Sequence, residues 1–200
     1  LDHLRPTGRD VRRVVAWPLL AAGAFCASFP LESRWSYRLG VALRAAVATA
    51  VLLRVARIHR PPTVRGLHRW LVWLVAWLVP AGFWMGALVP RLRGAALHVL
   101  FVGGFAQLAL AVATHVPLSH GGRADRLQAS PAPLRVMATL LAAAFGGRIL
   151  AGFDLSHVAG WLSLAGTAFT GAVGAWAVLV VPALRLNAAA RAPERPSAER

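Results

Sequence analysis

Residues 95–116 form an apolar run that constrains the fold of this chain more than any other feature. The run is long enough to cross the hydrocarbon core of a bilayer, about 30 Å, as one helix. It contains His98 near its start and His115 near its end, and it leads into a segment of turn-forming residues with His120 and Arg123. A histidine within a membrane helix is costly to bury, so it requires a partner or a bound metal. The run therefore indicates a membrane protein and the region in which its chemistry is found.

Five further apolar runs of similar character lie on either side of this one. In lipid every backbone N–H and C=O group must be paired within the protein, so such runs form helices. Short, turn-rich links at 30–32, 90–94 and 152–157 place consecutive helices side by side and antiparallel. We therefore predict an all-α, polytopic membrane helix bundle of about six transmembrane helices, at residues 14–29, 39–55, 70–89, 95–116, 134–153 and 158–181.

The arginines are distributed unevenly between the two ends of the predicted helices. Sixteen of the 22 basic residues, none of which is lysine, fall in the terminal segments, in the second and fourth links or at the span ends that adjoin these links. Because cytoplasmic loops carry an excess of basic residues, both termini are expected in the cytoplasm. The chain then divides into a basic cytoplasmic segment 1–13, a six-span bundle 14–182 and a polar cytoplasmic tail 183–200 that we expect to be disordered.

The composition excludes several classes of protein. The chain is 58% hydrophobic and 14% charged, with a net charge of +15. Its arginines form short clusters between apolar runs, so the lipid bilayer is an expected partner and nucleic acid is not. The single cysteine, Cys26, excludes an intrachain disulfide and a cysteine-based metal cluster. The sequence contains no phosphate-binding loop, zinc-protease motif or nucleophile elbow, so catalytic residues are not predicted and an enzymatic role stays open.

The polar residues within and beside the runs form an outer and an inner group. The outer group, within about two helical turns of the outer face, consists of His98, Arg44 and Arg148. The inner group consists of His115, His120 and Arg123. Because His98 and His115 are seventeen residues apart, about 25 Å along a helix, they cannot ligate one metal. Two separate sites are expected if both groups are functional.

Each group has a functional and a purely structural interpretation. An imidazole with two nearby arginines is suited to haem, whose iron takes an axial histidine and whose propionates pair with guanidinium groups. Alternatively, Arg44 and Arg148 extend to the interface, and Arg148 pairs with Asp154. In the inner group imidazole ligation of copper is chemically reasonable, although Pro117 separates the two histidines and places them off one helical face.

The outer and inner histidines belong to one longer motif that resembles the signature of the NnrS family. Residues 98–103, HVLFVG, are followed by a helix of small residues and then by ATHVPLSHGGR at 113–123. The positions that agree with the signature are His98, Gly103, Thr114, Leu118, His120, Gly122 and Arg123. Arginine, glycine and threonine are usual in the family where this chain has His115, Ser119 and Gly121. A less specific resemblance covers most of the chain from about Trp35 onward.

This resemblance implies a bacterial inner-membrane protein that contains haem and copper and takes part in the response to nitric oxide and nitrosative stress. Nitric oxide or a related small molecule is then a partner. The six spans would form the carboxyl-terminal half of a longer protein, with the missing amino-terminal half as a further partner. Our candidate residues for haem are His98, Arg148 and Arg44, from the outer group. The candidate metal ligands are His98, His120 and His115, and the further motif residues are Gly103 and Arg123.

Two other functions are compatible with the sequence. In a small transporter-like bundle, Arg44, Gln107 and Arg148 would line a polar path across the membrane. In a membrane scaffold, the histidines would have no function of their own. A haem absorption band in the purified protein distinguishes the haem- and copper-containing protein from both alternatives.

Overall fold

The computed structural model describes residues 8–64, 66–120 and 124–190 of the chain. Within these ranges the structure is helical and contains no strand. The α-helices are α1 (Gly8–Arg34), α2 (Tyr37–Val51), α3 (Leu67–Leu88), α4 (Arg93–His98), α5 (Gln107–His120), α6 (Ala124–Ala129), α7 (Ala132–Phe153) and α8 (Val158–Ala190). Short π-helical and 3-10 segments extend or join them: η2 (Leu52–Ala56), η3 (Pro90–Leu92), η4 (Val99–Ala106) and η5 (Leu155–His157).

Five segments of the described chain are long and apolar enough to cross a membrane: Tyr37–Ala56, Leu67–Leu88, Pro90–His120, Ala132–Phe153 and Leu155–Arg185. They correspond to the second to sixth predicted spans. The first predicted span, 14–29, lies within α1, which is not among these five. The prediction of an all-α membrane bundle is confirmed.

Two helices continue through residues at which the sequence predicted a turn. Helix α1 includes Pro30 and ends at Arg34, and α5 includes Pro117 and ends at His120. Proline removes one backbone hydrogen bond, but membrane helices tolerate it because neighbouring groups and local adjustment satisfy the freed carbonyl. The prediction of a turn at Pro117 was therefore wrong, since helix α5 passes through it.

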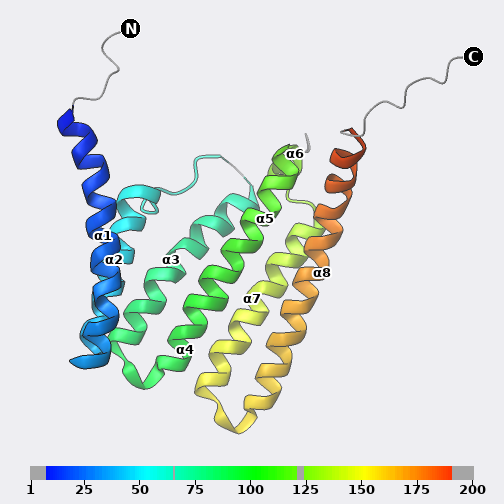
Figure 1. Cartoon of the computed structure of the whole chain (residues 1–200). Helices are drawn as coiled ribbons and strands as arrows, with labels where there is room; N and C mark the ends of the chain where they lie inside the picture. Colours follow the sequence, from blue (N-terminus) through cyan, green and yellow to red (C-terminus); the bar gives the residue numbers. More distant parts are fainter. Residues whose placement is uncertain (1–7, 65, 121–123, 191–200) are drawn as a thin grey trace, which may run out of the picture.

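Consecutive long helices run antiparallel from one end of the bundle to the other (Figure 1). Helix α1 packs on α2, α2 on α3, and α3 on the rod formed by α4, η4 and α5, while α8 packs on both α7 and α5. The start of α1, the end of α8 and helix α6 lie at the same end. This arrangement is the one expected if both termini share a side of the membrane, and the cytoplasmic assignment of that side stays a prediction.

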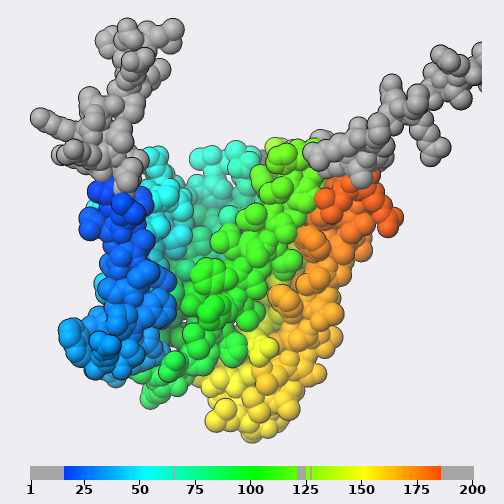
Figure 2. Space-filling view, in the orientation of Figure 1, coloured from blue at the N-terminus to red at the C-terminus, as the bar shows by residue number. Residues whose placement is uncertain are grey.

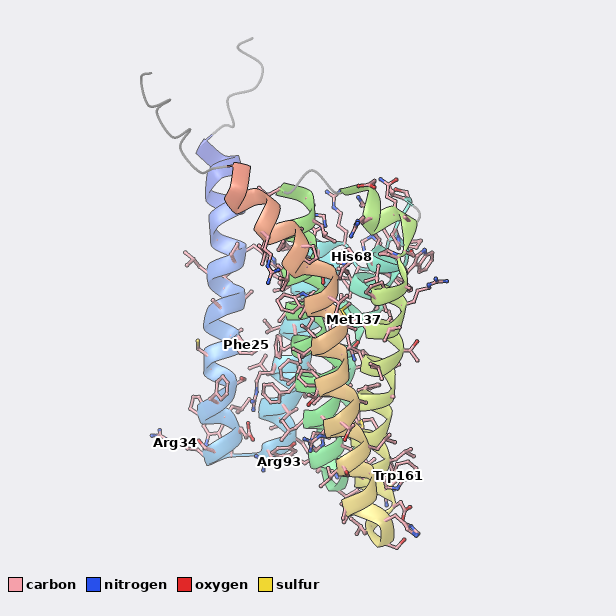
Figure 3. All side chains as sticks on the ribbon, turned by 90° about the vertical axis from the view of Figure 1, so that its right-hand side faces the viewer. Phe25, Arg34, His68, Arg93, Met137 and Trp161 are labelled. Carbon is pink, nitrogen blue, oxygen red and sulfur yellow. The ribbon has the colours of Figure 1, made fainter. Side chains whose placement is uncertain are left out.

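The largest buried apolar cluster lies between α5, α7 and α8, and Figure 3 shows one of its members, Met137, between these helices. Its members are Leu118, Leu134, Met137, Leu141, Ala172, Leu179, Val180 and Ala183. Large apolar side chains also cover the outside of the bundle, among them Leu20, Leu88 and Val178, each about two-thirds exposed or more. In the space-filling view the surfaces of α1 (blue) and α8 (orange) lie on opposite sides of the α4–α5 surface (green) (Figure 2). Such an outside is suited to lipid contact.

Glycines allow the continuous helical segment formed by α4, η4 and α5 to approach its neighbours closely. A Cβ atom on Gly82 of α3 would lie 2.8 Å from the backbone nitrogen of Leu100 in η4. A Cβ atom on Gly103 would lie 2.7 Å from Cε2 of Phe145 in α7. Gly103, which the sequence motif contains, is therefore buried at a point of close helix packing, where no larger residue fits without movement.

Candidate metal-binding site

The structure brings His68 and His115 together at the end of the bundle that carries most of the arginines. His68 lies in the first turn of α3, and His115 lies in the second half of α5. Their imidazole rings are nearly parallel, with an interplanar angle of 7° and ring centroids 5.6 Å apart. Figure 3 shows His68 near the end of the bundle where α6 lies, with Arg93 and Trp161 near the opposite end.

Both histidines line a cavity of about 510 Å³. Its walls come from η2, the following link, α3 and α5, and most of the lining is apolar, including Leu52, Val72, Trp73 and Val112. Two arginines, Arg60 and Arg69, also contribute to the lining. The volume lies within the range of cavities that hold small molecules or cofactors, about 300–1,000 Å³.

The two imidazoles differ in exposure and in hydrogen bonding. His68 is 4% exposed, and its Nδ1 atom is buried without a hydrogen-bond partner in the described structure. His115 is exposed, and its Nε2 atom lies 3.3 Å from the Ser119 hydroxyl. A buried imidazole nitrogen without a partner is costly, so it requires an explanation such as a bound ion or water.

Interactions from distant parts of the chain hold the surroundings of His68 in place. The backbone N–H of Leu67 donates to the hydroxyl of Ser130, at 3.0 Å. The indole N–H of Trp73 donates to the carbonyl of Ile58, at 2.7 Å, which ties the link after η2 to α3. That link begins at Arg57, whose φ of 51° ends the π-helical segment. Hydrogen bonds thus connect the elements that line the cavity.

His120 lies further along the same helix than His115 and does not join this pair. It is exposed, and its Nδ1–H donates to the Val116 carbonyl at 3.0 Å, which leaves Nε2 as the nitrogen with a free lone pair. Among the described residues no group of three or more His, Cys, Asp or Glu side chains is placed to hold one metal ion. Arg123, the last residue of the sequence motif, lies outside the described residues.

At the opposite end, the residues of the predicted outer group have different neighbours. His98 ends α4, is half-buried, and has Arg148 of α7 as a neighbouring charged group. Arg44 instead forms an ion pair with Glu32 of α1, and its guanidinium carbon lies 4.4 Å from the centroid of the Phe29 ring. The sequence analysis had not predicted the pairing with Glu32.

The alternative ion pair between Arg148 and Asp154 is not found in the part of the chain that the structure describes. Asp154 instead accepts hydrogen bonds from the Ser156 hydroxyl, from the Trp161 indole at 3.0 Å and from the His157 ring at 3.0 Å. These bonds, with Ser156 and then Trp161 contributing most, lower the pKa of Asp154 to about 2. Because Asp154 also accepts from the backbone N–H of His157, its role is that of a cap for the turn before α8.

His68 was not among the predicted site residues. The third span was predicted to begin at Trp70, whereas α3 begins at Leu67, so His68 fell in the preceding link. The signal that was present is topological, because this link and the end of the span that contains His115 were both predicted on the cytoplasmic side. The sequence alone does not show which of the several histidines at that face are neighbours.

The fold and this site define a class: a multi-span helical membrane protein with paired imidazoles near one membrane interface. The family model described as NnrS protein matches residues 3–187. The chain therefore belongs to the NnrS family, as its sequence motif had indicated. Comparison with curated proteins and with solved structures gave no match.

Proposed function

We propose that this protein is an NnrS-like inner-membrane protein that binds haem and copper and takes part in the response to nitric oxide. Membership of the NnrS family is the observation that carries the proposal. The structure supports this proposal because the helical segment formed by α4, η4 and α5 carries an imidazole near each end, His98 at one end and His115 at the other. When bound, haem iron and copper supply positions at which a small molecule such as nitric oxide can bind.

Beside His98 the structure provides an imidazole and a neighbouring cation, two of the groups that a haem site uses. The imidazole is half-buried in a membrane-spanning segment, and Arg148 is the cation beside it. In this proposal His98 would hold the iron, and Arg148 would pair with a propionate. Arg44 is a further candidate, although a propionate would have to replace Glu32 as its partner.

The histidines at the other end fit copper by ligand type, because imidazole is a good ligand for this metal. His115 and His120 are both exposed enough to meet an ion from the interface. In the proposal, copper binds at this end of the bundle and haem at the other, which agrees with the distance of about 25 Å between His98 and His115 along a helix.

The haem assignment is tested by the Soret absorbance of the purified, untagged protein, measured per folded protein. His98→Leu should remove most of the band and preserve the helical circular dichroism, because leucine suits a membrane helix. His59→Leu is the matched control, because His59 is exposed on the link after η2 and should leave the band unchanged. An unchanged band in His98→Leu contradicts the ligand role of His98. A parent protein that takes up neither haem nor copper contradicts the proposed function.

A further inference from the structure

We propose that His68 and His115 together form a two-imidazole site for a transition-metal ion, open to the cavity beside them. The proposal rests on the proposed function, since it assigns ligands for the copper that the family implies. It adds His68, which neither the sequence motif nor its position in the chain had indicated. The observation that carries it is a buried, unpartnered imidazole nitrogen in a cavity wall, beside a second imidazole.

The two rings form a stacked pair with centroids 5.6 Å apart and an interplanar angle of 7°, so their lone pairs converge on one ion only after the exposed His115 ring turns about its Cβ–Cγ bond. Metal–nitrogen bonds of imidazole ligands are about 2.0–2.1 Å long, so the separation of the rings is within reach of one ion once His115 has turned. An ion bound by Nδ1 of His68 would satisfy the atom that now has no partner.

The composition of the site selects the class of metal. Imidazole nitrogens suit copper, zinc, iron and nickel rather than magnesium or calcium, and copper(II) binds most tightly among the divalent ions of the first transition series. Two protein ligands leave coordination positions open toward the cavity. Because Arg60 and Arg69 line that cavity, a small anion is the favoured additional ligand.

The pair His68–His115 accounts for the geometry better than a pair His115–His120. The latter two residues are five positions apart on one continuous helix, so their side chains do not lie one above the other. The Nδ1 atom of His120 is already engaged by the Val116 carbonyl. Replacing His120 therefore distinguishes the two pairings, because only the pair His115–His120 loses a ligand.

The experiment is a copper(II) titration of the purified, untagged protein, read by bound copper and by tryptophan fluorescence. Trp73 lines the same cavity, so bound copper(II) should quench its emission. His115→Gln and His68→Gln should each weaken copper binding by at least about tenfold, the smallest effect expected when a ligand is removed. His59→Gln is the matched control, because His59 is an exposed histidine on the link after η2 that does not line the cavity, and it should bind copper as the parent does.

Because His68 is buried, the variant at the exposed His115, His115→Gln, decides the matter if His68→Gln loses helical circular dichroism. Copper binding that is unchanged in His115→Gln overturns the proposal. Copper binding that is lost in His120→Gln but kept in His115→Gln also overturns it, while the proposed function survives with other ligands. A parent protein that binds no copper overturns both the site and the copper part of the proposed function.

Discussion

At the residue scale, one buried nitrogen atom governs the behaviour expected of the arginine-rich end. The Nδ1 atom of His68 has no partner in the described structure, although a buried polar group without a partner costs about 1–3 kcal/mol. Replacing His68 by leucine removes that cost but also removes a proposed metal ligand. The substitution should therefore raise the stability of the metal-free protein and lower that of the metal-bound protein, relative to the parent.

We predict that His68→Leu unfolds at the same temperature as the parent, or higher, when both are free of metal. With copper at about 100 times its dissociation constant, the free energy of unfolding should rise by about 2.7 kcal/mol in the parent and by much less in the variant. The measurement is thermal unfolding in detergent, followed by circular dichroism, with and without a copper chelator. A variant that copper stabilises as much as the parent would exclude His68 as a ligand.

Asp154 allows a prediction about pH, because it lies between the spans and its pKa is lowered to about 2. An aspartate in an unfolded chain has a pKa of about 3.9. The carboxylate therefore stabilises the folded state fully above about pH 4, and this contribution is lost as the pH falls toward 2. The unfolding temperatures of the parent and of Asp154→Asn should differ at pH 6 and converge near pH 2. A difference that does not change with pH would contradict the assignment.

The sequence could predict some site residues but not their partners. His98 and His115 stood out because an ionisable group in an apolar run is unusual. Arg44 pairs with Glu32, and His115 lies beside His68, so each partner comes from another helix. Which residues meet across two helices depends on how each helix is rotated about its axis. Helix rotation is set by packing against neighbours, and one sequence without its structure does not determine it.

At the element scale, the close approach of α3 to the π-helical segment η4 depends on Gly82. A Cβ atom there would meet the backbone of Leu100, whereas one on Gly86 would have ordinary contacts of 3.4 Å or more. Gly82→Ala should therefore destabilise the bundle by about 1–3 kcal/mol, and Gly86→Ala by clearly less. Denaturant-induced loss of helical signal in detergent compares the two variants. Equal stabilities of Gly82→Ala and Gly86→Ala would show that α3 and η4 can move apart without loss of stability.

The start of α3 provides a second prediction at this scale. Its preceding residue, Gly66, supplies no side-chain cap, and the N–H of Leu67 is instead bound by Ser130 from the turn before α7. Ser130→Ala should cost about 0.5–1.5 kcal/mol, the usual net value of one hydrogen bond. Ser33→Ala is the matched control, because the exposed Ser33 hydroxyl bonds the Pro30 carbonyl of its own helix, and the same unfolding measurement compares the two variants. An equal loss of stability in both variants would contradict the role assigned to the bond between Leu67 and Ser130.

Most elements were predictable because the length of an apolar run limits where a membrane helix can lie. The ends of the elements were less predictable. Pro30 and Pro117 were interpreted as turn residues, but both lie within helices. A rule drawn from helices in water does not apply here, because a lipid-facing chain must keep its backbone hydrogen bonds and so tends to remain helical.

At the scale of the whole molecule, the arrangement of the helices makes the orientation testable. Thr63 lies on the link after η2, at the arginine-rich end, and Ser33 and Gly94 lie at the opposite end. In a Cys26→Ala background, cysteine at Thr63 should react only with a permeant reagent in intact cells. Cysteine at Ser33 or Gly94 should react with an impermeant one, because the arginine bias places these residues outside. The opposite pattern would reverse the orientation.

The overall class of the molecule followed from the sequence, whereas the neighbours of each helix did not. Alternating apolar runs and short links specify an up-and-down bundle. The packing of α8 on both α7 and α5, and the position of η4 between α3 and α7, depend on small residues such as Gly103 whose contacts are visible only in three dimensions.

The unequal lengths of the spans have a consequence for the membrane that surrounds them. The segments Pro90–His120 and Leu155–Arg185 each contain 31 residues, about 46 Å of helix, whereas Tyr37–Ala56 contains 20, about 30 Å. The longer helices can match a bilayer of given thickness by tilting or by extending into the headgroups, but the short helix has no extra length with which to match a thicker bilayer. The segment Tyr37–Ala56 therefore sets the thickest hydrocarbon layer that the protein fits without deforming the lipid around it.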